Sequence, residues 1–236
     1  MMSPLLIKLL EIMPKKVRVA LVRKGVRGYI KKYADLEVNG LENIDNAKGP
    51  IIFICNHLSN ADALILHELL KDSDPYFVAG VKLTTDPVTN FGMEMVKTIN
   101  IKPNSADKEA MTNIVKTVKE GNNLFIFPEG TRSRTGAMIE ARKGILLIVR
   151  LTKATVIPIG ISGTEKVLPI RQDGDMGGER WQQGRVKVNI GTAVSLPAKE
   201  KDEAKHDYED RCLTTLMKSI AKLLPESYRG VYGEER

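Results

Sequence analysis

The segment IIFICNHLSNADALILHELLK, residues 51–71, joins a strand pattern, a polar turn and a helix pattern without a break. The five apolar residues of IIFIC (51–55) predict a buried β-strand, and the apolar spacing of ALILHELLK (63–71) predicts a helix. Between them, NHLSNAD (56–62) holds a histidine and an aspartate five residues apart. The pattern therefore predicts a strand-to-helix turn that carries ionisable side chains.

Strand and helix patterns alternate in the same way from Asp35 onward. Further strands are predicted for LEVNG (36–40), YFVAG (76–80), KTINI (97–101), NLFIF (123–127), TVIPIGI (155–161) and RVKVNIG (185–191). Further helices are predicted for residues 87–96, 107–121, 141–152 and 209–224. Such alternation is typical of an α/β layered fold with a largely parallel central sheet flanked by helices. We expect one such domain over residues 35–236, with its site in the loops at the strand ends.

Residues 1–34 form a basic arm that precedes this domain. The first 32 residues hold nine Lys and Arg side chains against one acid, Glu11, a net charge of +8. The remaining residues hold 27 bases and 28 acids, so the basic character belongs to the arm and not to the whole fold. Residues 4–13 predict a short apolar helix, and residues 17–33 predict a basic amphipathic helix.

Two interpretations of the two-helix arm stay open at this point. It can lie in a membrane interface, where each cation near anionic head groups contributes about 1 kcal/mol. It can equally pack on the core and leave a solvated basic face. Nucleic acid is not an expected partner, because only 5% of the residues are aromatic and no nucleic-acid-reading helix is recognisable.

The composition favours a protein of a reducing compartment. The two cysteines, Cys55 and Cys212, have no disulfide or zinc-ligand spacing, and both are expected to be buried apolar side chains. No run of 18 apolar residues exists and the N-terminus has no signal-peptide pattern. We therefore expect a cytoplasmic protein that is peripheral or monotopic at the cell membrane and does not span it.

His57 and Asp62 would point about 140° apart on a straight helix, so they meet only if the segment turns. A turn at His57, with Ser59 or Asn60 as the helix cap, allows the carboxylate to reach back to the imidazole. Asp62 would then fix the ring tautomer and leave the other ring nitrogen as a general base. The alternative is a plain cap with a surface hydrogen bond.

No nucleophile is evident beside this pair. The sequence has no G-x-S-x-G elbow, and Ser59 lies too close in the same turn to complete a triad. The other two histidines, His67 and His206, are interpreted as helix-face residues. A histidine and an aspartate without their own nucleophile suit the deprotonation of a substrate hydroxyl.

The second polar loop, FPEGTRS (127–133), follows the strand NLFIF. Pro128 ends the strand, Gly130 allows a tight turn, and Arg132 offers a guanidinium fork that matches a phosphate or carboxylate. The alternative for Arg132 is a surface pair with a neighbouring acid, which contributes little. The loop therefore predicts an anion site whose main ligand is the Arg132 guanidinium.

Together the two loops resemble the motifs of the glycerolipid acyltransferase family, which includes 1-acylglycerol-3-phosphate acyltransferases. NHLSNAD is similar to the family's H-x4-D motif, and FPEGTRS is similar to its phosphate-site motif. TVIPIGISGTEKVLP (155–169) resembles a later apolar motif that contains proline. The resemblance covers residues 35–200, with the motifs in the family's order.

The resemblance implies a role for each motif residue. His57 takes the proton of a glycerol hydroxyl and Asp62 orients it, so that the oxygen attacks an acyl thioester directly. The residues that hold the acceptor's glycerol phosphate are Glu129, Gly130, Thr131, Arg132 and Lys102. In KTINIKPNSADKEA (97–110) the family's further phosphate-binding arginine is replaced by Pro103, and Lys102 is the nearest cation.

Neighbours of the motif residues receive weaker assignments. Ser133 and Arg134 are expected to shape the loop. Arg142 and Lys143 either extend the positive field or are solvated. Pro158 is interpreted as an edge or bulge residue of its strand.

The implied function is 1-acyl-sn-glycerol-3-phosphate O-acyltransferase, which converts lysophosphatidic acid to phosphatidic acid. The partners are a lysophospholipid acceptor, an acyl thioester donor and an anionic membrane surface met by residues 1–32. No metal and no cofactor are expected; acyl-CoA or acyl carrier protein thioester is the co-substrate. The alternatives are an acyltransferase for another lysophospholipid, a non-catalytic lipid-binding protein of the same fold, and a thioesterase or lipase. The donor, chain length, exact acceptor and oligomeric state are open.

Overall fold

The computed structural model describes residues 4–81, 87–102, 107–171, 173, 176 and 178–233. Its strands are β1 (Ala34–Asn39), β2 (Ile51–Cys55), β3 (Tyr76–Gly80), β4 (Thr98–Ile101), β5 (Leu124–Ile126), β6 (Thr155–Ser162) and β7 (Gly184–Ile190). Its α-helices are α1 (Pro4–Ile12), α2 (Lys15–Tyr33), α3 (Glu42–Asp45), α4 (Asn60–Leu69), α5 (Pro87–Glu94), α6 (Lys108–Lys119), α7 (Gly144–Thr152), α8 (Thr164–Val167) and α9 (Lys205–Ala221). Two 3-10 turns, η2 (Glu226–Tyr228) and η3 (Gly230–Tyr232), follow α9.

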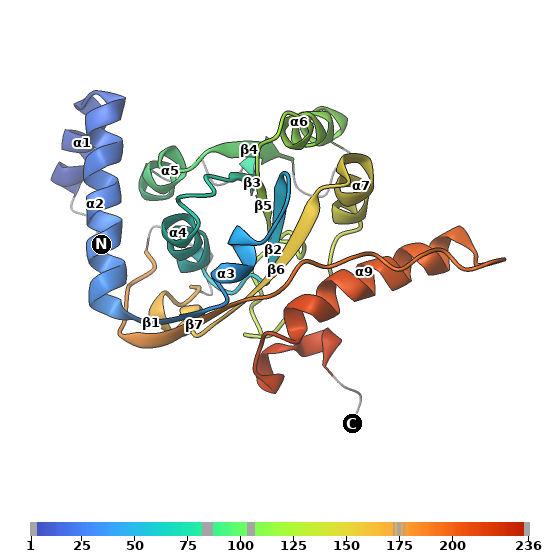
Figure 1. The fold of residues 1–236 in the computed structure, drawn as a ribbon. Helices are drawn as coiled ribbons and strands as arrows, with labels where there is room; N and C mark the ends of the chain where they lie inside the picture. The colour runs from blue at the N-terminus through green and yellow to red at the C-terminus, as the bar shows by residue number, and fades with distance from the viewer. Residues whose placement is uncertain are drawn as a thin grey trace.

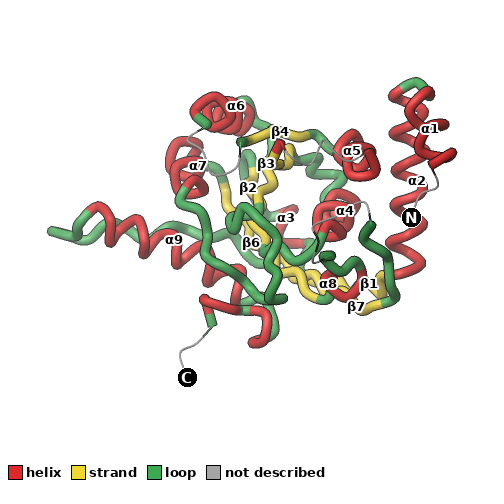
Figure 2. The backbone as a smooth tube through the Cα atoms, turned by 180° about the vertical axis from the view of Figure 1, so that it is seen from behind, coloured by secondary structure: helices red, strands yellow, loops and turns green. Residues whose placement is uncertain are grey.

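The described strands form one seven-stranded sheet in the order β1-β7-β6-β2-β5-β3-β4. Five neighbouring pairs are parallel, and only β6 and β7 are antiparallel, so β1 and β7 run opposite to the other five strands. Helices surround this sheet in both views (Figures 1 and 2). The predicted α/β fold with a largely parallel sheet is confirmed.

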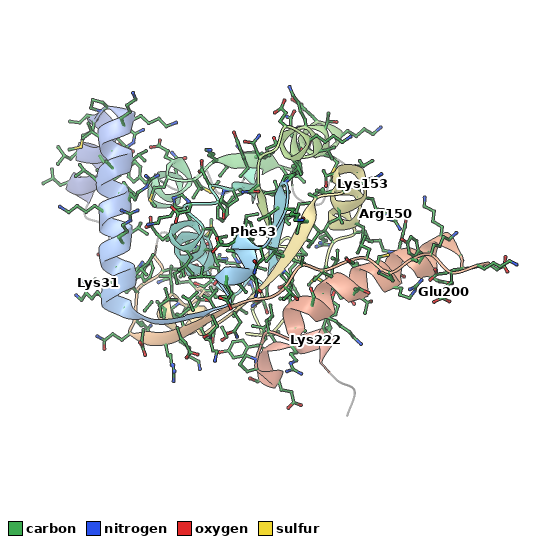
Figure 3. All side chains as sticks on the ribbon, viewed as in Figure 1. Lys31, Phe53, Arg150, Lys153, Glu200 and Lys222 are labelled. Atoms are coloured by element: carbon green, nitrogen blue, oxygen red, sulfur yellow. The ribbon has the colours of Figure 1, made fainter. Side chains whose placement is uncertain are left out.

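Strand β2 is buried on both faces because helices cover both sides of the sheet. Alternate side chains enter different cores: Phe53 and Cys55 pack with α4 and β7, whereas Ile52 and Ile54 pack with α6, α7 and α9. Phe53 lies at the centre of the molecule, while Lys31 extends outward from α2 (Figure 3). Both cysteines are fully buried, as expected.

The predicted boundaries differ from the observed ones mainly at helix ends. Helix α4 begins at Asn60 instead of residue 63, because Ser59 caps it, and α7 begins at Gly144 instead of residue 141. Of the two alternatives expected for Pro158, the edge strand is wrong, because β6 is an interior strand with β2 and β7 as neighbours. The bulge agrees with the pairing, since Val156 and Ile159 are three positions apart whereas their partners Val194 and Ile190 are four apart. The β6–β7 pairing ends at Ile159, so the missing N–H of Pro158 falls just beyond the ladder.

Helices α1 and α2 stand along one side of the domain, where α2 packs against α4, α5 and β1 (Figure 1). Arg18 donates two hydrogen bonds of 2.8 Å to Glu94 of α5, and Arg23 donates to the carbonyl of Met95. Helix α2 is thus attached to the domain by Arg18 and Arg23, and Arg27 adds an ion pair with Glu68 of α4. The division into an arm of residues 1–34 and a domain of residues 35–236 remains a prediction. Helix α2 ends at Tyr33 and β1 begins at Ala34, close to this boundary.

A glycine allows β6 to turn into α8. Gly163 has a φ of +88°, and a Cβ atom there would lie 2.0 Å from the carbonyl oxygen of Arg185. Only glycine fits this close backbone approach. The turn fixes where α8 ends and therefore where the carbonyl of Leu168 lies, a position that the site uses.

We predict that Gly163→Ala destabilises the protein by several kcal/mol more than Gly49→Ala. Gly49 also has a positive φ, +73°, but no atom lies within 4 Å of its Cβ position, so its substitution costs only the backbone strain of about 1 to 3 kcal/mol. Urea unfolding of both variants measures the difference. Equal losses of unfolding free energy would show that the contact with Arg185 is relieved at little cost.

Candidate active site

Both motif loops leave neighbouring strands at the same edge of the sheet. Strand β2 runs into the turn at His57, and β5, which pairs with β2 in parallel, runs into FPEGTRS. Asn56 fixes the exit from β2, because its side-chain amide donates to the carbonyl of Ile161 at 2.8 Å and accepts from the Ile161 N–H at 2.9 Å. The carboxyl edge of the parallel strands, where α/β sheets commonly bind ligands, carries the candidate site.

The predicted pair is formed: the Nδ1 atom of His57 lies 2.8 Å from Oδ2 of Asp62. The same carboxylate oxygen accepts the backbone N–H groups of Leu58 at 2.6 Å and Ser59 at 2.9 Å. Asp62 is fully buried, and among the described residues its Oδ1 atom has no hydrogen-bond partner. A carboxylate accepts only, so Nδ1 carries the proton that it donates, and Nε2 is left with a lone pair.

Ser59 is the helix cap and not a nucleophile. Its hydroxyl oxygen accepts the N–H of Ala61 at 3.1 Å and donates to the carbonyl of Leu168 at 2.7 Å. The side chain is fully buried. Cys55 is equally unsuited to attack, because burial raises the pKa of its thiol well above the usual value. A serine or cysteine acyl-enzyme has no support in this turn.

The imidazole of His57 is held from its face as well as from its edge. The ring stacks on Phe127 with a centroid distance of 3.8 Å and an angle of 11°. Phe127 is the first residue of the second motif loop, so one loop orients the histidine that the other loop carries. The His57 side chain is only 15% exposed. Within the described residues Nε2 makes no hydrogen bond, which leaves it available to a substrate hydroxyl.

Glu129 has a different position from the acceptor contact that the resemblance implies. It is 1% exposed, and its two oxygens accept the backbone N–H groups of His57 and Ile139, each at 3.0 Å. Burial raises the pKa of this carboxyl to about 7, against the opposite effect of the two N–H donors, and the nearby Asp62 adds to the rise. The structure therefore assigns Glu129 to joining the two loops.

A second bond joins the loops through their backbones, since the N–H of Ser133 donates to the carbonyl of His57 at 2.7 Å. Gly130 has a φ of +71°, and a Cβ atom there would lie 3.2 Å from Cγ of Arg142. A side chain at position 130 would thus be strained and crowded. Ser133 and Gly130 shape the loop, in agreement with the role expected for Ser133.

Arg132 extends toward a third segment that no motif indicated. Its Nη1 atom donates to Oε1 of Glu179 at 2.6 Å, and the other oxygen of Glu179 accepts from the side chain of Asn60 at 2.9 Å. Sequence reasoning missed Glu179 because it lies 47 residues from Arg132, in a stretch without a recognisable pattern. The candidate anion-binding arginine is therefore already paired with a carboxylate.

The remaining predicted residues lie farther out. Thr131 and Arg134 are exposed in the loop, and Arg142 is exposed beside it. Lys143 instead pairs with Asp210 of α9 at 2.8 Å. Lys102 directly follows β4, which lies two strands away from β5, so the sheet does not place it beside FPEGTRS. Pro103 lies outside the described residues.

Comparisons with known proteins agree with this geometry. A family model described as Acyltransferase matches residues 35–162, which include both motif loops. The chain belongs to this acyltransferase family. Its fold is similar to the crystal structure of the 1-acyl-sn-glycerophosphate acyltransferase PlsC from Thermotoga maritima. That comparison has a TM-score of 0.63 at 22% identity and covers 91% of this chain and 85% of the other.

Curated relatives carry the name 1-acyl-sn-glycerol-3-phosphate acyltransferase. A chloroplastic one from Brassica napus is 31% identical over 142 residues, covering 58% of this chain and 40% of the relative. One from Arabidopsis thaliana is 28% identical, covering 68% and 44%. One from Haemophilus influenzae is 24% identical, covering 76% and 72%. The chain thus spans less than half the length of the two plant relatives.

The pKa of Glu129 predicts a specific dependence of stability on pH. Because the folded-state pKa of about 7 exceeds the ordinary value of 4.5, the protonated carboxyl favours the folded protein below pH about 4.5. This contribution is lost as pH rises from about 4.5 to about 7. We predict that the unfolding free energy of the wild type minus that of Glu129→Gln decreases over this range, by up to about 3 kcal/mol. Urea titrations from pH 4 to 8 measure it. A constant or increasing difference contradicts the prediction.

Proposed function

We propose that the protein is a 1-acyl-sn-glycerol-3-phosphate O-acyltransferase, which acylates the free hydroxyl of lysophosphatidic acid to give phosphatidic acid. The observation that carries this proposal is the contact of 2.8 Å between Nδ1 of His57 and Oδ2 of Asp62. It fixes the imidazole so that Nε2 can take the hydroxyl proton as a general base. The shared name of the curated relatives supports this acceptor.

The reaction proceeds by direct transfer. Nε2 of His57 accepts the hydroxyl proton while the oxygen attacks the thioester carbonyl carbon and forms the new C–O bond. The tetrahedral centre then expels the thiolate as the C–S bond breaks, and the imidazolium returns the proton to give a thiol. Asp62 stabilises the imidazolium between these steps. No protein nucleophile is needed, in keeping with the buried cap role of Ser59.

Arg132 is proposed to bind the acceptor phosphate beside this base. The loop that carries Arg132 is joined to the His57 turn by the bonds from His57 to Glu129 and from Ser133 to His57. Such joining sets a constant separation between the phosphate site and the base, and this favours one hydroxyl of a glycerol phosphate over others. Thr131 and the loop backbone complete the acceptor contacts, and Lys102 remains a proposed outer cation.

The rival functions predict different chemistry. A non-catalytic lipid-binding protein has no use for an oriented base with a free Nε2. A thioesterase or lipase would pass the acyl group to water and has no use for an anion site beside the base. Acyl-CoA and acyl carrier protein thioester both remain proposed donors, with no metal or cofactor required. Acyl release measured with and without lysophosphatidic acid separates transfer from hydrolysis.

The arm is proposed to hold the protein on the cytoplasmic face of a membrane. Exposed apolar side chains of α1 and the start of α2 are Leu5, Leu9, Ile12, Val17 and Leu21. Exposed cations of α2 are Lys15, Lys16, Lys24, Arg27, Lys31 and Lys32. Apolar side chains among acyl chains and lysines at anionic head groups would bring the site to a bilayer-embedded acceptor. In the described part of the chain, no helix has both the length and the hydrophobicity to cross a bilayer.

We predict that His57→Ala lowers kcat/KM for phosphatidic acid formation by about 10²- to 10⁴-fold, because it removes the general base. Asp62→Asn should lower it nearly as much, since the charge that stabilises the imidazolium is lost. Transfer of a radiolabelled acyl group to lysophosphatidic acid measures the rate.

The matched control is His206→Ala. His206 also lies beside an aspartate, Asp210, at 3.0 Å, but the pair is exposed on α9. This variant should transfer at the wild-type rate. A His57→Ala protein that keeps its fold and its activity would remove the basis of the proposed mechanism.

We predict that changing five exposed lysines of the arm to glutamine weakens binding to anionic vesicles by at least about 100-fold, because each cation contributes about 1 kcal/mol. The positions are Lys15, Lys16, Lys24, Lys31 and Lys32. Arg18 and Arg23 are kept, because they attach α2 to α5 and its C-terminal end. Sedimentation with phosphatidylglycerol vesicles at low salt measures the binding.

The control removes the same charge elsewhere, from the exposed residues Lys48, Lys116, Lys119, Lys205 and Lys222. This variant should bind vesicles nearly as well as the wild type. Equal binding losses in both variants would mean that net charge alone governs the interaction. Unchanged binding in both variants would support the alternative interpretation, in which the arm is a packed helix pair with a solvated basic face.

A further inference from the structure

Glu179 is a buried carboxylate between the two motif loops. Its side chain is 2% exposed, whereas the Arg132 side chain that it contacts is 16% exposed. Oε1 accepts from Arg132 at 2.6 Å and Oε2 accepts from Asn60 at 2.9 Å. A carboxylate removed from water is costly unless its oxygens are satisfied, so these bonds hold both partners firmly.

The two partners belong to different halves of the site. Asn60 is the first residue of α4, and Asp62 lies in the same first turn. Arg132 belongs to the loop after β5. Glu179 therefore connects the general-base turn to the anion loop from a third segment, independently of the bonds made by Glu129 and Ser133.

The segment that carries Glu179 is itself anchored. Trp181 packs against Tyr29 and Tyr33 of α2, with ring-centroid distances of 5.8 Å and 6.3 Å. The N–H of Gln182 donates to the carbonyl of Val167 at 2.8 Å. Both contacts lie within three residues of Glu179. The carboxylate is thus presented from packed structure and not from a free loop.

Arg132 keeps most of its binding capacity in this pair. A guanidinium has five N–H donors in a rigid fork, and the bond to Glu179 is made by Nη1 alone. A free arginine side chain loses rotamer entropy when a ligand fixes it. Pairing with Glu179 fixes the side chain before the acceptor arrives, which leaves the remaining donors to the phosphate.

We infer that Glu179 is a positioning residue that orients the Arg132 guanidinium toward the acceptor phosphate and fixes it relative to the turn carrying His57. This inference rests on the proposed acceptor role of Arg132. The opposite effect would be competition, in which the carboxylate occupies the arginine and the phosphate must displace it. Burial and the second bond to Asn60 favour a carboxylate that stays in place.

The test compares Glu179→Ala and Glu179→Gln with the wild type in acyl transfer. Glu179→Ala should raise KM for lysophosphatidic acid roughly tenfold, as expected for a lost charge-assisted hydrogen bond, with kcat within about twofold. Glu179→Gln should fall between them, because a glutamine keeps the size and a neutral hydrogen bond to Arg132. For the uncharged acceptor monoacylglycerol, KM should stay the same in all three proteins.

A double-mutant cycle shows whether Glu179 acts through Arg132. In an Arg132→Ala background, adding Glu179→Ala should change KM for lysophosphatidic acid little, because the group being positioned is gone. Glu203→Ala is the matched control. The Glu203 side chain precedes α9, is 11% exposed and pairs with an arginine, Arg211, at 2.8 Å. It should leave KM for both acceptors unchanged.

Two kinetic results would overturn the inference. A lower KM in Glu179→Ala would show competition, and an equal rise in KM for charged and uncharged acceptors would show a purely structural role. Calorimetric binding of glycerol 3-phosphate separates the inference from the proposed function. If the wild type transfers no acyl group but Glu179→Ala weakens this binding, the proposed function fails and the positioning role stands. If the wild type does not bind glycerol 3-phosphate, the positioning role falls. Circular dichroism melts of each variant confirm folding.

Discussion

The backbone of His57 is held at both of its polar groups by the neighbouring loop, and the rest of the site depends on this constraint. Its N–H donates to Glu129 at 3.0 Å and its carbonyl accepts from Ser133 at 2.7 Å. Both partners follow β5, which pairs with β2 in parallel. The parallel pairing brings the two loops to one edge, and these two bonds fix the separation between His57 and Arg132.

Three buried carboxylates, Asp62, Glu129 and Glu179, surround this constraint. Each is costly to bury and each is offset by hydrogen bonds that reach another segment: Asp62 to the His57 ring and turn, Glu129 to two backbone N–H groups, and Glu179 to Arg132 and Asn60. Removing one hydrogen-bond donor leaves a buried carboxylate oxygen without a partner, which is costly. This cost keeps the three segments in one arrangement. The burial of charge here favours one arrangement of three loops.

The sequence predicted the parts of the fold that depend on local pattern. Long apolar and amphipathic runs such as β2 and α6 follow directly from side-chain period, and the His57–Asp62 contact follows from the need for a turn. The direction of β1 and β7 was not predictable, because strand direction leaves no trace in the pattern. Helices as short as α3 and α8 have too few residues to show a period.

Motif resemblance predicts which residues belong to the site, but not the direction in which each side chain points. Glu129 illustrates this: the motif includes it among the acceptor contacts, yet its carboxylate turns inward to two backbone donors. Glu179 illustrates the opposite case, a residue that contacts both motif loops although no motif includes it. Its proposed role depends on a contact with a residue 47 positions away in the sequence, which only the folded chain reveals.

The arm and the two motif loops are parts of one packed structure. The outer face of α2 carries exposed lysines. Its inner face contacts Trp181 through Tyr29 and Tyr33, and Trp181 lies two residues after Glu179. Removing the arm would therefore expose apolar rings and loosen the segment that holds Arg132, so lost activity in such a deletion would not distinguish membrane binding from site assembly. Charge changes confined to the outer face separate the two, because they leave the ring contacts of Trp181 with Tyr29 and Tyr33 and the Arg18–Glu94 pair in place.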